Sequence, residues 1–195
     1  KLEGGQSLTL GFDYEIIKDN DSKIFTSSLG QIFRDVNNSN LPKKSKMQTK
    51  RSDIVGEINF FPNDNLKFKY NFSADNDLES ADYNRITSDI IINNFVTTFD
   101  FLEENDEIGK NSYFAKKIKY DFDGSNSILY NTRRNRKTDL TEFYNLIYEY
   151  KNDCLVASIE YNKDYYEDRG LQPNEEIFFS LTITPFASVS SPSIK

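Results

Sequence analysis

Alternation of apolar and polar side chains is the feature that most constrains how this 195-residue chain folds. Its most informative stretch is residues 140 to 166. One face there collects Tyr144, Leu146, Tyr148 and Tyr150 and, after the polar turn 151–153, Leu155, Ala157, Ile159 and Tyr161. Successive side chains of a β-strand point to opposite faces, so this period predicts two strands. The short polar connection predicts that they form an antiparallel hairpin.

The same strand–turn–strand pattern recurs along the whole chain and predicts an all-β protein of about eleven strands without helices. The expected strands are 7–17, 23–35, 53–61, 66–74, 79–92, 94–103, 112–122 and 126–135, the two strands of the hairpin, and 175–184. Because every connection joins sequence neighbours, the simplest topology is an antiparallel up-and-down meander.

Composition excludes several functional classes. The chain has no histidine, which removes Ser-His and Cys-His nucleophiles and histidine-metal sites. The net charge of −7 argues against a nucleic-acid-binding surface. Carboxylates are abundant, but no Asp or Glu pair stands out from turn and loop chemistry. We therefore expect no enzyme, no cofactor and no nucleic-acid partner.

Strand length and loop length favour an outer-membrane β-barrel over a soluble sheet. Many strands run for about 10 residues, close to what a tilted strand needs to span a bilayer. Connections after odd-numbered strands are short, whereas those after even-numbered strands are mostly longer, with 75–78 as the exception. Outer-membrane barrels have short periplasmic turns and long external loops. A porin and a soluble all-β binding protein remain as alternatives.

The loop lengths also orient the expected barrel in the outer membrane of a Gram-negative bacterium. The last strand ends in the periplasm and the first begins outside. Since complete bacterial barrels have an even number of strands, eleven strands imply that an N-terminal part is missing. We expect residues 1–186 to form a partial barrel, the C-terminal part of a large one, and residues 187–195 to form a tail.

In this interpretation the polar face lines the barrel lumen. Its candidate residues are Lys67, Lys69, Asn71, Lys117, Lys119, Glu149, Glu160 and Asn162. A merely solvated sheet face has the same spacing. Lys116 and Arg134 fall on the apolar face, and we expect both near a membrane interface, because a cation at the midplane costs about 2–4 kcal/mol.

Several segments resemble a known family. They are YNLIYEYKNDCL at 144–155, YYEDR at 165–169, Pro173, IFF at 177–179, GQIFR at 30–34 and RSDIVGE at 51–57. Together they resemble the C-terminal barrel of the LptD family of LPS-assembly proteins, also called organic solvent tolerance proteins, in its α-proteobacterial version. The resemblance is specific at 140–184 and softer at 63–125.

The resemblance implies a non-enzymatic role in inserting lipopolysaccharide into the outer leaflet. It implies a periplasmic jellyroll domain before the barrel, an LptE-type lipoprotein plug inside it, and recognition of the terminal strand by the barrel-assembly machinery. Lipid would leave where the first and last strands of the barrel meet. The last strand contributes Ile177, Phe178, Phe179, Ser180, Leu181, Thr182 and Ile183 to this expected lateral gate.

The resemblance also gives a role to Cys154, the only cysteine. It matches the family's barrel cysteine, which pairs with a cysteine of the periplasmic domain. Better-known members have two adjacent cysteines, whereas this chain has Asp153-Cys154, so at most one such bond is available. Loop lengths independently place Cys154 at a periplasmic turn, in an oxidising compartment. An unused thiol is the alternative.

Lys67, Lys69 and Arg133 are candidates to meet lipopolysaccharide phosphates.

Overall fold

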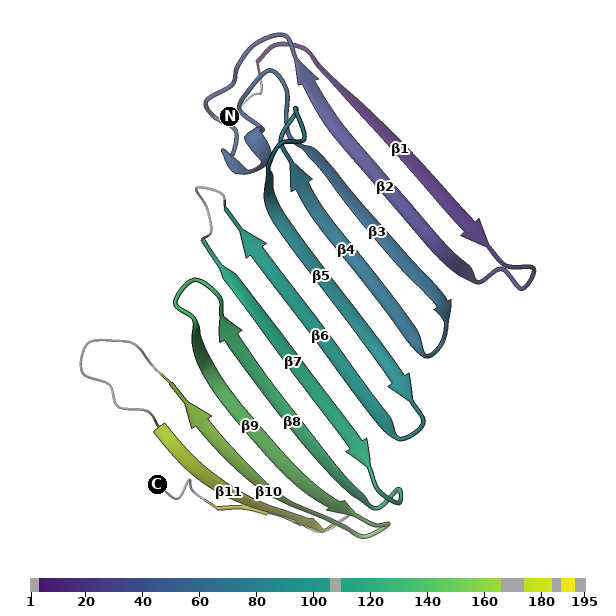
Figure 1. Cartoon of the computed structure of the whole chain (residues 1–195), viewed down its shortest axis with the longest axis vertical. Helices are drawn as coiled ribbons and strands as arrows, with labels where there is room; N and C mark the ends of the chain where they lie inside the picture. Colours follow the sequence, from purple (N-terminus) through teal and green to yellow (C-terminus); the bar gives the residue numbers. More distant parts are fainter. Residues whose placement is uncertain (1–3, 106–109, 166–173, 184–186, 192–195) are drawn as a thin grey trace. The chain divides into compact units, whose positions relative to one another are not determined.

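The computed structural model describes residues 4–105, 110–165, 174–183 and 187–191 and is built almost entirely of strands (Figure 1). The strands are β1 (Ser7–Ile17), β2 (Lys23–Arg34), β3 (Ile54–Asn63), β4 (Leu66–Ala74), β5 (Ala81–Ile92), β6 (Phe95–Glu104), β7 (Ser112–Asp121), β8 (Asn126–Asn135), β9 (Leu140–Lys151), β10 (Leu155–Asp164), β11 (Asn174–Ile183) and β12 (Ala187–Ser190). One short 3₁₀ turn, η1 (Lys44–Lys46), lies between β2 and β3. No helix in the described residues has the length and apolarity needed to cross a membrane.

The strand order in the sheet follows the sequence from β1 to β12, which confirms the all-β, up-and-down meander. The count differs by one, because β12 lies in the segment expected to be a tail. It has four residues, too few for alternation to reveal, and pairs with β11 from Ser180↔Ser190 to Ile183↔Ala187. That residues 1–186 are part of a larger barrel stays a prediction.

The strands divide between two compact units. Unit 1 comprises residues 1–88 and 100–112, and unit 2 comprises residues 89–99 and 113–195. The boundary cuts across β5 and β6. Connections retain the predicted pattern in both units, since the longest ones, 35–53 and 165–173, follow the even strands β2 and β10.

In unit 2, pairing register aligns like side chains across five strands. One transverse row joins Tyr120, Ile128, Tyr148, Ile159 and Phe179. On the opposite face another row joins Lys117, Asn131, Asn145, Asn162 and Glu176. The alternation read from single strands thus becomes one apolar face and one polar face of the sheet.

Burial runs opposite to that of a soluble domain. Phe12 on β1, Tyr148 on β9 and Phe179 on β11 are 58%, 42% and 45% exposed, and they lie on apolar faces. Among the described residues, Ala74 and Leu102 are the buried hydrophobic ones, whereas the carboxylate residue Asp53 is 0% exposed. A sheet of this composition has no apolar core of its own, so its apolar face needs an apolar cover from outside the described residues.

Gly56 on β3 provides space for an aromatic ring in unit 1. It pairs with Leu29 on β2 and Phe72 on β4. A Cβ at this position would lie 2.5 Å from two ring carbons of Phe72 and 2.7 Å from Cδ2 of Leu29. The Phe72 ring therefore lies across the glycine, where any other residue would displace it.

Replacing Gly56 should destabilise the sheet. In Gly56→Ala we expect the free energy of unfolding to fall by about 1–3 kcal/mol, as for other overpacked sites. The matched control is Gly30→Ala on β2, where the new Cβ would lie 3.8 Å from the nearest atom, the backbone oxygen of Leu10. Urea unfolding in detergent measures both variants. Equal midpoints would show that the Phe72 ring adapts without cost.

Candidate functional site

The polar face of unit 2 brings several predicted lumen residues together. Asn145 Nδ2 donates hydrogen bonds to Glu160 Oε1, at 2.7 Å, and to Asn162 Oδ1, while Asn162 Nδ2 donates to Glu160 Oε1 at 3.0 Å. At the short-turn end, Lys119 and Glu149 line the same cavity of about 410 Å³. The polar face of unit 2 therefore carries one hydrogen-bonded group of three side chains and, near the short turns, a separate cavity with a polar lining.

Three further predicted lumen residues, Lys67, Lys69 and Asn71, lie on β4 in unit 1. Lys69 pairs with Asn59 in register, and its ammonium lies 5.9 Å from the ring centre of Phe61. Asn71 pairs with Glu57. The eight candidates thus form two groups, one in each unit. Whether they face a lumen is not decided by this geometry and stays a prediction.

The two cations on the apolar face differ in their position along the strands, because Arg134 lies near the end of β8 whereas Lys116 lies in the middle of β7. Arg134 is near the end of β8, and its Nη2 lies 2.7 Å from Oδ1 of Asp139 in the following turn. Lys116 pairs with Thr132, between the rows Phe114↔Arg134 and Ile118↔Tyr130. The position of Arg134 agrees with the expected avoidance of the middle of the apolar face, whereas the mid-strand position of Lys116 does not.

The predicted gate strand, β11, alternates in exposure along its length. Ile177, Phe179, Leu181 and Ile183 are exposed, whereas Phe178, Ser180 and Thr182 are half-buried. It pairs with β10 over its whole length but with β12 only over Ser180–Ile183. An apolar groove of about 450 Å³ is lined by residues of β9 to β11 and by Val189 of β12. A role in lipid exit stays a prediction.

Cys154 lies in the turn between β9 and β10, and its side chain is exposed. The Asn152 side chain shapes this turn, because its Oδ1 accepts hydrogen bonds from the backbone amides of Cys154, at 3.0 Å, and Leu155, at 2.8 Å. The thiol is therefore held at the tip of a well-formed turn, accessible to a partner from outside this chain segment.

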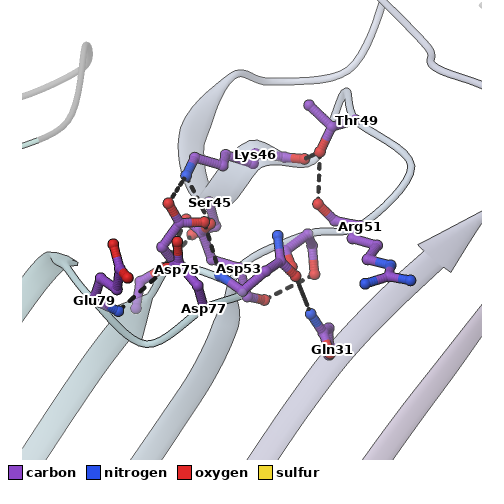
Figure 2. A network of polar contacts seen from close by, with 12 residues as sticks. Gln31, Ser45, Lys46, Thr49, Arg51, Asp53, Asp75, Asp77 and Glu79 are labelled. Atoms are coloured by element: carbon purple, nitrogen blue, oxygen red, sulfur yellow. Dashed lines mark hydrogen bonds and ion pairs between the residues drawn. The ribbon is translucent and has the colours of Figure 1, made fainter.

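Sequence reasoning missed a buried polar cluster at the end of β2 to β4, where the connection 35–53 folds over the strands (Figure 2). The backbone amide of Asp53 donates to the Ser45 oxygen at 3.0 Å. Its carboxylate accepts a hydrogen bond from Ser73 Oγ at 3.3 Å. Lys46 Nζ lies 2.6 Å from Asp75 Oδ2 and 3.8 Å from Asp53 Oδ1.

The ionisation of this cluster follows from burial and from Lys46. Burial raises the pKa of the Asp53 carboxyl, and the neighbouring Lys46 charge opposes that rise. The hydrogen bond with Lys46 lowers the pKa of Asp75 and raises that of Lys46. Ser45 and Lys46 have φ angles of 51° and 48°, in the left-handed region, which costs about 1–3 kcal/mol for each residue. The ion pairs offset that strain and fasten the connection to the strand ends.

Removing the Lys46 charge should release the connection. In Lys46→Gln we expect faster hydrogen–deuterium exchange in residues 36–52 and a loss of about 1–3 kcal/mol in unfolding free energy. This is less than for a fully buried pair, because Lys46 is 37% exposed. The control is Lys50→Gln in the same connection, whose side chain is exposed. Unchanged exchange in Lys46→Gln would contradict the fastening role.

The same pair predicts a pH dependence. Because the folded state raises the pKa of Lys46, its contribution is complete below the ordinary lysine pKa of 10.5 and is lost as pH rises through the folded pKa. The difference in unfolding free energy between the wild type and Lys46→Gln should therefore shrink at alkaline pH. It should also shrink in acid, where protonation of Asp75, whose pKa the pair lowers, removes the partner of Lys46. Unfolding midpoints measured across this range check it, and a difference that disappears at neutral pH would contradict it.

Comparison with protein families gives one assignment. A family model described as LptD, LPS transport system D, matches residues 1–119. The matched part includes the segments at 30–34 and 51–57, the Asp53 cluster and the lumen candidates of β4 and β7. The hairpin with Cys154 and strand β11 lie outside it, so their resemblance to the family stays a prediction. A comparison with curated proteins found no match.

Proposed function

The chain belongs to the LptD family, and on this premise we propose that it forms part of an outer-membrane β-barrel that inserts lipopolysaccharide into the outer leaflet. The role is transport and membrane assembly without catalysis. The observation that carries the proposal is the sidedness of the sheet, with large apolar side chains exposed on one face and a polar network on the other.

The apolar face suits lipid because its central row is apolar across five strands of unit 2, from Tyr120 to Phe179. Strands of 9 to 12 residues, from β1 to β11, match the roughly 9–11 residues that a tilted strand needs to cross a bilayer. The polar face, with Lys117, Lys119, Glu160 and Asn162, suits a lumen through which a charged sugar headgroup passes. The partners that accompany this function are an LptE-type plug, a periplasmic jellyroll domain of the same protein and the barrel-assembly machinery.

Neighbouring positions on β9 provide a matched test of this orientation. Leu146 lies on the apolar face and Ile147 on the polar face, paired with Glu160. Lysine at Leu146 should cost about 2–4 kcal/mol in lipid and prevent assembly, whereas lysine at Ile147 should be tolerated beside the glutamate. Each variant replaces the wild-type protein in cells. Heat-modifiable mobility on gels reports barrel assembly, and antibody labelling of intact cells reports surface lipopolysaccharide.

We expect Leu146→Lys to lose both signals and Ile147→Lys to keep both. Equal assembly of the two variants would contradict the lipid-facing assignment of the apolar face. If cells depleted of the protein still carry normal amounts of surface lipopolysaccharide, the transport role is wrong even where the barrel assembles.

Cys154 is proposed to form a disulfide with a cysteine of the periplasmic domain. What supports this is its exposed position at the tip of a short turn, on the side where barrels have periplasmic turns. In the full-length protein, non-reducing gels should show a mobility that Cys154→Ser and reductant both change. Cys154→Ser with unchanged mobility would show that the thiol is unused.

A further inference from the structure

A pocket on the polar face of unit 2 lies where the turn 136–139 joins β8 to β9. It has a volume of about 300 Å³, at the lower end of the range for small-molecule sites. Its lining includes Arg133, Asn135, Glu142, Phe143, Asp164 and Tyr165. Arg133 and Phe143 are cross-strand partners, and Asp164 is the next partner along the same row. Strand register therefore brings three of these six residues together, namely Arg133, Phe143 and Asp164.

A β-bulge directs Glu142 into this pocket. The register of β8 with β9 passes from Arg133↔Phe143 to Arg134↔Thr141, so Glu142 is an extra residue on β9. Bulges reorient side chains at the ends of strands and beside binding sites. Here Glu142 reaches Arg133, where Nε donates to Oε2, and Asn135, whose Nδ2 donates to Oε1 at 3.2 Å. A regular ladder at this point would direct its side chain to the opposite face.

Aromatic rings and paired charges give the pocket its chemistry. The Arg133 guanidinium lies 5.5 Å from the ring centres of both Tyr113 and Phe143, and Tyr165 lines the pocket as well. Because Arg133 is already paired with Glu142, the pocket lacks the excess positive charge that a phosphate group needs. It instead offers carboxylate and amide acceptors, a guanidinium donor and aromatic faces. This combination suits a sugar ring, which carries hydroxyl groups on its edge and C–H groups on its faces.

From this arrangement we infer that the pocket binds one uncharged sugar unit of the saccharide part of lipopolysaccharide. Phe143 and Tyr165 contact the C–H face of the sugar, whose weakly positive hydrogens suit the negative face of an aromatic ring. Glu142 and Asp164 accept hydrogen bonds from its hydroxyl groups. The choice of lipopolysaccharide as the source of the sugar rests on the proposed function, whereas the sugar chemistry rests on the pocket.

Saturation-transfer NMR on the intact protein in detergent tests this inference. Three probes are compared, namely deacylated lipopolysaccharide oligosaccharide with its phosphates, the same oligosaccharide after phosphate removal, and inorganic phosphate. We expect both oligosaccharides to bind with similar affinity, with transfer to the C–H protons of one sugar unit. Inorganic phosphate should not compete.

Variants assign the binding to the pocket. Phe143→Leu removes the aromatic face and Glu142→Gln removes the charged acceptor. Each should weaken binding roughly tenfold, the effect of losing one charged hydrogen bond or its equivalent. Phe61→Leu is the matched control for an aromatic ring beside a cation. Asp100→Asn is the control for a cross-strand ion pair, because Asp100 accepts from Arg85 Nε at 3.0 Å.

The outcomes separate this inference from the proposed function. If removing the phosphates abolishes binding, or if inorganic phosphate competes, the pocket is an anion site and the inference is wrong. The inference is also wrong if Phe143→Leu and Glu142→Gln bind the oligosaccharides as well as the wild type does. Surface labelling of lipopolysaccharide in cells is measured in parallel. If the protein delivers lipopolysaccharide but binds neither oligosaccharide, only the pocket inference is wrong. If the protein binds the oligosaccharides but cells deliver lipopolysaccharide without it, only the transport role is wrong.

Discussion

Strand register is the constraint on which the rest of the structure depends. Tyr148 pairs with Ile128 on one side and Ile159 on the other, and the polar residues one step along each strand pair among themselves. A slip of one residue between two strands would exchange the faces of one of them and place Glu149 in the apolar row. Because most bulges lie near strand ends, as between Phe60 and Asn63 or at Glu142, the central rows keep a single register.

The fold was largely predictable because its signal is local. Period-two alternation appears within single strands, so the hairpin at Leu140–Asp164 is evident before any partner strand is known. Turn residues fix its connection, as with the side chain of Asn152. β12 was missed because four residues with small side chains carry too little periodicity to distinguish a strand from a tail. Its position depends on the edge of β11, which no local pattern in β12 describes.

The polar sites were less predictable because they depend on contacts between strands. Asn145 alternates with the tyrosines of β9 in the sequence, but its hydrogen bonds to Glu160 and Asn162 require the register of β9 with β10. Asp53 is the first residue of the expected strand 53–61, where nothing in the pattern indicates burial, and its burial results from a connection that folds back over it. The clue was the length of 35–53, since a connection that long either covers something or stays exposed. The bulge at Glu142 has no signature in the sequence that we recognise.

The division into an apolar face and a polar face does not explain why each unit places costly features beside a connection that follows an even-numbered strand. Ser45 and Lys46 hold left-handed backbone angles, and Asp53 has no exposed surface, yet none of these residues contributes to an apolar row. In unit 2, the bulge at Glu142 gives up one position of the backbone ladder to orient a single carboxylate. Features that lower stability without adding to the apolar rows are best explained by the groups that they position. The left-handed residues and the bulge each position polar groups beside one of the longer connections. The alternation of the strands thus produces the two faces of the sheet, and the departures from it produce the polar clusters beside these connections.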